Sequence, residues 1–471
     1  MGVLRAWCLR NRLPLAVVAG CWLLRLALIA LGGQFCWPDE WRYYRGVEWL
    51  NRMLHGEFRE PLRENLGQAG HVGFILASLL PAAAQGVVRA VTGLHPEDTL
   101  ALPAAWYALF SAAIPGLVYA LMLRSGGDRR EAALAMLFAA SSTALLHYSR
   151  HLFPYDLSMF LWLLALWLGL GPRPSPRTSY ACGLLGGAAF TVYNGYWLGA
   201  GLALAVHVLW RPGSAAGAAR RALAAFAGLV TLPLLIALAG RLAGVSYLDA
   251  LQTHSGSLIG GRYEEGAVVT WLYLWNNEAL FLPLWAAGAL LALRVPRARM
   301  WVGLAFGVYA VHVLFSLGLH KFVVFGRLAR QIILSASPPR DGAGVPAPGR
   351  GPAVALLALM AVQTAVNWRP VFTQTFPDDF FHAAEARVGR ANLQVGLTVA
   401  GPDVRDEPDL LCPALRRRER LPAQARQRRA WPCRPADLLR RRCTSSSSRG
   451  TGTTECGPTA TSSAIRSTAC A

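Results

Sequence analysis

The sequence predicts an all-α protein, a polytopic bundle of transmembrane helices. Of its 471 residues, 54% are hydrophobic and only 15% are charged, whereas a soluble domain carries about 25% charged residues. Several apolar runs approach the roughly 20 residues that a helix needs to span a bilayer. The two-residue alternation that is typical of membrane β-barrels is absent from the sequence.

The first helix is expected at about residues 13–33, with a cytoplasmic N-terminus. Arg5, Arg10 and Arg12 come before the spanning run, and its full length favours a retained helix over a cleaved signal peptide. Arg25 interrupts the run about eight residues, or about 12 Å, below its outer end. An ionisable group at that depth indicates a specific partner, and we expect an internal ion pair rather than a part in catalysis.

Further apolar runs bring the expected number of spans to about eleven. They lie near residues 101–123, 132–147, 155–170, 180–193, 197–210, 222–244, 271–293, 300–319, 322–338 and 353–367. Basic residues concentrate in the connections 124–130, 171–177, 211–221 and 294–299, which the positive-inside rule places on the N-terminal side. That arrangement requires the run at 71–92 not to cross, so we expect an interfacial or re-entrant helix there. The alternative is an ordinary span, with one span missed elsewhere.

The remaining connections then face outward and hold most of the ionisable and aromatic residues that no topology rule requires. They are a long first outer loop (34–100), then 147–156, 191–197, 245–270 and the start of 318–331. The cytoplasmic connections have the composition of charge anchors, so a functional site is expected in the outer loops.

Two adjacent acids, Asp39 and Glu40, follow the first helix at the membrane–water interface. A carboxylate there is partly desolvated, which can tune it as a base. The following segment 41–54, WRYYRGVEWLNRML, reads as an amphipathic helix lying in the interface. The alternative is that the Pro-Asp-Glu sequence only caps the start of this helix.

This arrangement resembles the GT-C membrane glycosyltransferases, particularly the protein O-mannosyltransferase and aminoarabinose-transferase branch (glycosyltransferase family 39). In that fold a first helix leads into an outer loop that opens with an Asp-Glu pair, followed by Arg-Tyr; here these are Asp39, Glu40, Arg42 and Tyr43. The resemblance implies transfer of a sugar from a polyprenyl-phosphate carrier to an acceptor hydroxyl on the outer face. It implies that Asp39 is the catalytic base, that Glu40 helps to position the acceptor or a metal, and that Arg42 and Tyr43 position substrate.

Transfer also needs cations on the departing phosphate, and the segment 318–331 supplies them. His320, Lys321, Arg327 and Arg330 cluster there, and Lys321 is the only lysine of the chain. A compact ammonium suits a phosphate as a point charge; the alternatives are chance or an anchor at the interface. His-Lys followed by Arg resembles a late-loop pattern of other GT-C mannosyltransferases, although Phe322 and Val323 replace the acids usual after it.

The other outer loops offer weaker candidates. Arg150 and Asp156 in the second outer loop resemble the basic residue and second acid of the short GT-C loop, so Arg150 is a candidate for the donor phosphate. Asp156 is a tentative ligand of a divalent metal, with a helix cap equally favoured. His147 and His151 lack a carboxylate partner in sequence and give a weak zinc signal. The fourth outer loop, 245–270, contains His254. Its composition suggests a mobile lid over the carrier or acceptor, and the simpler alternative, a solvated loop, is favoured.

The chain divides into an expected transmembrane domain (1–370), an outer-face extension (371–411) and a basic tail (412–471). The tail holds thirteen arginines against three acidic residues and so carries half of the net charge of +20. Its composition predicts disorder, or a reading-frame slip in a GC-rich gene. We therefore assign it no function and expect no nucleic-acid partner.

The sequence thus favours a glycosyltransferase of the inner or plasma membrane, with Asp39 facing Lys321 across an outer cleft. Its expected partners are a polyprenyl-phosphate sugar, membrane lipids and a glycan, lipid or protein acceptor. The alternatives are a transporter or flippase of lipid-linked sugars, which would need polar groups at mid-membrane and broken helices, and a non-catalytic membrane subunit.

Overall fold

The structure, a computed structural model, describes part of the chain. The described residues are 11–32, 34, 40–67, 72–94, 96–171, 175–209, 214–259, 275–293, 299, 301–308, 310 and 350–373. They belong to one unit of the chain, Met1–Phe380, and no β-strand occurs among them. The all-α prediction is therefore confirmed, whereas the expected extension beyond Thr373 and the basic tail lie outside the described residues.

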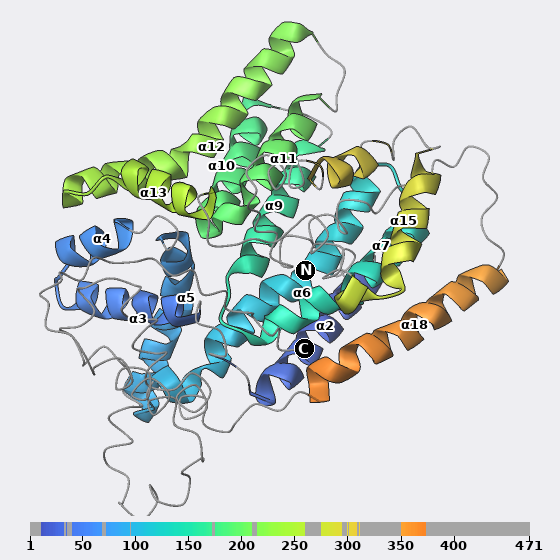
Figure 1. The fold of residues 1–471 in the computed structure, drawn as a ribbon, viewed down its shortest axis with the longest axis horizontal. Helices are drawn as coiled ribbons and strands as arrows, with labels where there is room; N and C mark the ends of the chain where they lie inside the picture. Colours follow the sequence, from blue (N-terminus) through green and yellow to red (C-terminus); the bar gives the residue numbers. More distant parts are fainter. Residues whose placement is uncertain are drawn as a thin grey trace, which may run out of the picture. The chain divides into compact units, whose positions relative to one another are not determined.

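Helices make up nearly all of the described part of this unit (Figure 1). The first are α2 (Arg12–Ala30), α3 (Trp41–Leu54), α4 (Arg59–Leu66), α5 (Val72–Thr92), α6 (Ala101–Arg124), α7 (Arg129–Ala140) and α8 (Thr143–His147). There follow α9 (Tyr155–Gly169), α10 (Pro176–Val192), α11 (Trp197–Leu209), α12 (Ala215–Ala243), α13 (Tyr247–Ile259), α15 (Phe281–Ala292) and α18 (Arg350–Thr373). Short 3₁₀ helices occur at η2 (Pro96–Thr99), η3 (Tyr148–Arg150) and η4 (Asn194–Tyr196).

The expected eleven spans are not confirmed. Among the described residues, four helices are long and apolar enough to cross a membrane: α2, α5, α6 and α12. A fifth is possible if α7 and the helical segment from α8 through η3, which meet at a bend of 53°, form one broken span. Several of the predicted runs form helices that are too short to cross a membrane alone; α11, for example, has 13 residues, about 20 Å of helix.

The run at 71–92 forms one continuous helix, α5, of 21 residues. Pro81 lies inside it without interrupting it, so the segment lacks the break that a re-entrant loop needs. Its length and apolar character satisfy the alternative that the sequence left open, an ordinary span. It packs against α3 and α6.

Close packing of α10 on α12 depends on glycine. A Cβ atom at Gly183 would lie 1.8 Å from the carbonyl oxygen of Ala225, and one at Gly187 would lie 2.3 Å from that of Leu229. On the facing helix, a Cβ at Gly228 would lie 2.0 Å from the carbonyl oxygen of Tyr180. Small residues spaced four apart let two helix backbones approach each other in this way.

A buried carboxylate holds the bend between α7 and α8. Glu278, in the helical turn 275–278, accepts hydrogen bonds from Ser142 Oγ at 2.7 Å, Ala144 N at 3.1 Å and Thr143 N at 3.2 Å. These two N–H groups belong to the first turn of α8 and have no partner within a helix. Glu278 therefore fixes the direction in which α8 leads toward the second outer loop.

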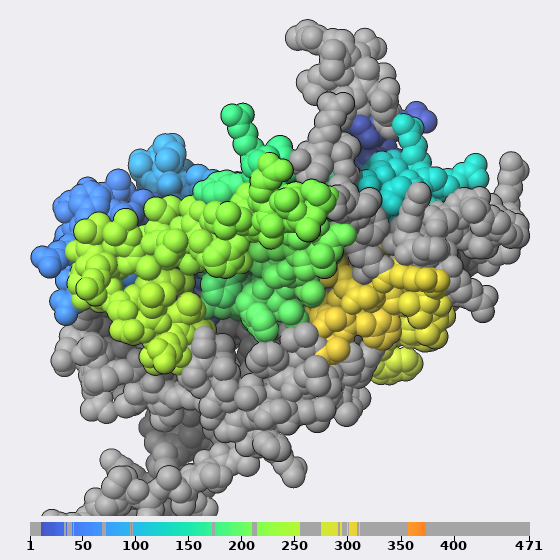
Figure 2. Space-filling view, turned by 90° about the horizontal axis from the view of Figure 1, so that it is seen from above, coloured from blue at the N-terminus to red at the C-terminus, as the bar shows by residue number. Residues whose placement is uncertain are grey.

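In the view of Figure 2, α12 and α13 lie at the front of the unit, with parts of other helices beside them. Leucines along α12 are more than half exposed, among them Leu234, Leu238 and Leu242. The opposite pattern occurs in α9, where Trp162 is fully buried and donates a hydrogen bond to Gly199 O. An exposed apolar surface on a helix of spanning length is what a lipid-facing helix requires.

Candidate functional site

The second acid of the Asp-Glu pair joins the first outer loop to the second. Glu40 is fully buried, and its Oε1 atom accepts a hydrogen bond from the backbone N–H of Leu152 at 2.6 Å. Its Oε2 atom lies 3.6 Å from Nδ1 of His151, which is also buried. Although Glu40 directly precedes α3, its side chain makes no capping hydrogen bond to that helix. The carboxylate is therefore used for contact between the loops.

The buried side chain of Arg150 donates hydrogen bonds to backbone carbonyl groups at the C-terminal ends of two helices. It is fully buried, and its Nε and Nη2 atoms donate to Gly32 O at 2.9 and 2.6 Å, directly after α2. Its Nη1 atom donates to Val371 O in the last turn of α18 at 3.1 Å. Carbonyl groups at helix C-termini lack partners within the helix and attract cations. This placement gives Arg150 an anchoring role, in contrast to the predicted contact with the donor phosphate.

Arg25 has internal hydrogen-bond partners within the bundle. The Arg25 guanidinium donates to Ser111 Oγ at 2.9 Å and to Cys21 O at 3.0 Å. Arg25 and Ser111 are buried, so this hydrogen bond joins α2 to α6. The expected ion pair of Arg25 with an internal acid stays a prediction.

The tentative metal ligand Asp156 is buried at the start of α9. Within the part of the chain that the structure describes, no three His, Cys, Asp or Glu side chains gather closely enough to hold an ion. A role of Asp156 in metal binding thus stays a prediction.

Aromatic side chains surround the junction of the two loops. The rings of His147 and His151 lie 5.7 Å apart, and His151 lies 5.7 Å from Phe153. Phe153 stacks on Tyr155 at 4.7 Å, and Tyr155 contacts Tyr193 of the third outer loop at 4.5 Å. Three of the predicted outer loops therefore meet at one place, as the expected site requires.

The amphipathic helix predicted after the acids is present as α3, and its buried side includes Tyr43 as well as Trp49, which the sequence suggested would lie at headgroup depth. Tyr43 and Trp49 are buried, and a Cβ at Gly46 would lie 2.7 Å from Ser78 Cβ of α5. The sequence suggested a face for lipid headgroups, whereas the partner is α5. Tyr43 donates to Gln85 Oε1 at 2.6 Å, so the structure gives this predicted substrate-positioning residue a protein partner.

Arg42, the other predicted positioning residue, faces the fourth outer loop. Burial, and then the charge of Arg42, lower the pKa of His254 in α13 below its ordinary value. The imidazole is therefore neutral at pH 7, and a basic side chain of the first loop lies near α13. Burial also raises the pKa of Tyr43, which keeps its hydroxyl a hydrogen-bond donor.

The remaining predicted site residues lie outside the described residues. They are the base Asp39 and the phosphate-binding candidates His320, Lys321, Arg327 and Arg330. The predicted approach of Asp39 to Lys321 thus stays a prediction.

Two residues that join separate segments at the candidate site were missed from the sequence. Glu278 is the only acid of the apolar run 271–293, and that isolation was the available signal. His151 was noted only as a weak zinc ligand, although it is the fifth residue of the second outer loop, 147–156, and the structure places it beside Glu40. Comparison with known protein families found no match, and no curated protein matches the chain.

Proposed function

We propose that the chain is a membrane glycosyltransferase of the GT-C type, with its N-terminus in the cytoplasm. It transfers a sugar from a polyprenyl-phosphate carrier to an acceptor hydroxyl on the outer face of the inner or plasma membrane. The observation that carries the proposal is the bond from Leu152 N to Glu40. A buried acid of the expected motif joins two loops that the topology independently assigned to the same side.

In this proposal Glu40 supports catalysis by anchoring the Asp-Glu pair. Its buried carboxylate ties the start of α3 to the second outer loop, and Asp39 directly precedes it in the sequence. A positioned carboxylate at an interface is suited to act as a general base. The anchoring role of Glu40 replaces direct contact with the acceptor in this proposal.

In the proposed reaction, Asp39 takes the proton of the acceptor hydroxyl while the hydroxyl oxygen attacks the anomeric carbon of the sugar. The bond between that carbon and the phosphate oxygen breaks, and its electron pair leaves with the polyprenyl phosphate. His320, Lys321, Arg327 and Arg330 are the cations proposed to stabilise the leaving phosphate.

The test is an assay of the purified full chain with a panel of polyprenyl-phosphate sugars, with and without divalent metal. Asp39→Asn should lower the transfer rate by roughly 100- to 10,000-fold, the usual effect of losing a general base. Glu40→Gln should lower it less, because Gln still accepts one hydrogen bond. Glu64→Gln, a change at an exposed acid of α4, should leave the rate unchanged. Full activity of Asp39→Asn would contradict the proposal.

A transporter of lipid-linked sugars is the second candidate, and one observation favours it. The bent pair of α7 with α8 and η3, with buried Glu278 at the bend, is the kind of broken helix that transporters use. In vesicles, a transporter would move a fluorescent lipid-linked sugar across the bilayer with Asp39→Asn as fast as the unaltered chain. Loss of movement with Glu278→Gln alone would then favour transport over transfer.

A further inference from the structure

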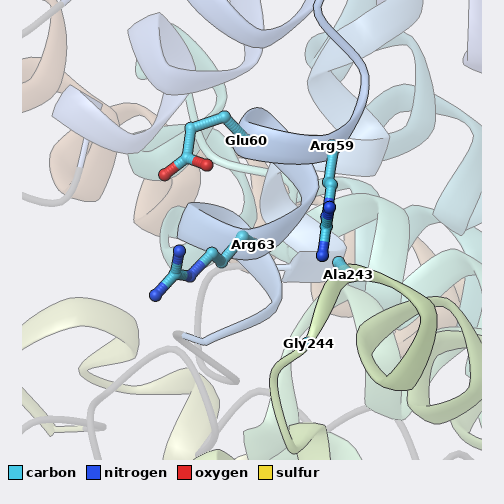
Figure 3. A pocket seen from close by; sticks show the side chains of 5 residues that line it. All are labelled: Arg59, Glu60, Arg63, Ala243 and Gly244. Carbon is cyan, nitrogen blue, oxygen red and sulfur yellow. The ribbon is translucent and has the colours of Figure 1, made fainter.

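A cavity of about 420 Å³ opens between α4 and the end of α12 (Figure 3). It is lined by Arg59, Glu60, Arg63, Ala243 and Gly244. Below it, Leu66 of α4 and Ile236 of α12 are buried in a shared apolar cluster with Tyr247. The cavity is thus framed by two helices that pack firmly on each other.

The cavity carries a net positive charge. Arg59 and Arg63 are exposed, and neither forms an ion pair with a described residue. The nearby acids Glu57 and Glu64 are bound instead to Arg52, at 2.9 and 2.8 Å. Glu60 is the one acid that lines the cavity, so two cations face one anion there.

An apolar path leads to the cavity along α12. Leu234, Leu238 and Leu242 recur every fourth residue, on one side of the helix, and are 60%, 58% and 76% exposed. The helix ends next to them at Ala243, which lines the cavity. A charged cavity at the end of an apolar stripe matches the two parts of a membrane lipid.

We propose that this cavity binds the headgroup of an anionic phospholipid. The phosphodiester lies between Arg59 and Arg63, because guanidinium groups bind phosphate through charge-assisted hydrogen bonds. One acyl chain lies along the exposed leucines of α12. Glu60 limits the site to a headgroup with a single negative charge and accepts a hydrogen bond from a headgroup hydroxyl, as a glycerol headgroup offers.

The experiment measures retention of phosphatidylglycerol by the purified full chain in detergent, by native mass spectrometry over a lipid titration. Arg59→Gln/Arg63→Gln should weaken binding by about tenfold, since both contacts are partly screened by water. Arg129→Gln/Arg130→Gln, which removes the same charge from exposed residues at the start of α7, should stay within about twofold of the unaltered chain. Circular dichroism confirms that each variant remains folded.

Two further arms separate the possible ligands. Leu238→Gln should also weaken phosphatidylglycerol binding, because it interrupts the apolar path, and soluble glycerol 3-phosphate should not displace the lipid. Displacement by glycerol 3-phosphate would show a site for soluble phosphate and overturn the proposal. Equal binding by the Arg59/Arg63 variant and the unaltered chain, or an equal loss in the Arg129/Arg130 control, would overturn it as well.

Discussion

The contact between α10 and α12 makes one substitution unusually informative. Gly183→Ala adds a Cβ that would lie 1.8 Å from Ala225 O, whereas non-bonded carbon and oxygen atoms need more than about 3 Å. The obstacle is backbone, which cannot rotate away as a side chain can. The two helices must therefore separate by about 1.5 Å, and their other contacts loosen with them.

The expected cost follows from two opposing effects. Overpacking a rigid contact lowers the free energy of unfolding by about 1–3 kcal/mol and occasionally more. Because the atom that the new Cβ would meet is backbone and cannot move aside, we expect a loss of about 3–4 kcal/mol from overpacking at this site. Alanine favours the helical state over glycine by about 1 kcal/mol. The net loss of unfolding free energy should therefore be about 2–3 kcal/mol.

Gly201 of α11 is the matched control. It is also a helical glycine, but no heavy atom lies within 4 Å of a Cβ built there. Gly201→Ala should therefore be neutral or stabilising by up to about 1 kcal/mol. The measurement is the midpoint of SDS unfolding in mixed micelles, followed by circular dichroism. Equal midpoints for the two alanine variants would refute the close approach of α10 and α12.

Three other predictions concern polar contacts. Glu278→Ala leaves three buried donors without their acceptor and should lower the free energy of unfolding, measured by SDS titration, by about 3 kcal/mol, with Glu278→Gln intermediate; an unchanged unfolding free energy for the alanine variant would contradict its role at the bend. Tyr43→Phe keeps the ring but loses the bond to Gln85 and should cost about 1 kcal/mol by the same measurement; a stabilised variant would argue against that bond. Because the pKa of His254 is lowered in the folded chain, the unfolded state binds its proton first as the pH falls. Stability should therefore decrease from pH 7.5 to pH 5.5, and His254→Gln should reduce this decrease; an identical pH dependence in both chains would exclude a contribution from Arg42 and burial.

The sequence was sufficient for those features that depend on composition and periodicity. The helical class and the amphipathic segment 41–54 were both predicted, and the mid-helix position of Arg25 indicated a specific internal partner, which is Ser111. The number of spans stays unconfirmed, because an apolar run does not reveal whether its helix is long enough to cross a membrane; α11 has only 13 residues.

The side chain or backbone group that each polar residue contacts was harder to predict from the sequence. Arg150 has the charge expected for phosphate binding, and only its burial against Gly32 and Val371 assigns it elsewhere. The glycines of α10 carry a recognisable spacing, since Gly183 and Gly187 are four residues apart, so their packing could have been proposed. The bond between Glu40 and Leu152 spans 112 residues, and no local pattern encodes such a distance.

The clamp made by Arg150 has a consequence for biosynthesis. One of its acceptors, Gly32, leaves the ribosome early, whereas the other, Val371, follows Arg150 by 221 residues. Until α18 has been synthesised and inserted, the guanidinium can satisfy only part of its hydrogen bonds, so the second loop stays incompletely locked. The contact between Arg150 and both helix ends is therefore completed only when the late helix α18 is present. In a nascent chain halted before α18, Arg150 would keep its hydrogen bonds to Gly32 and lack the one to Val371.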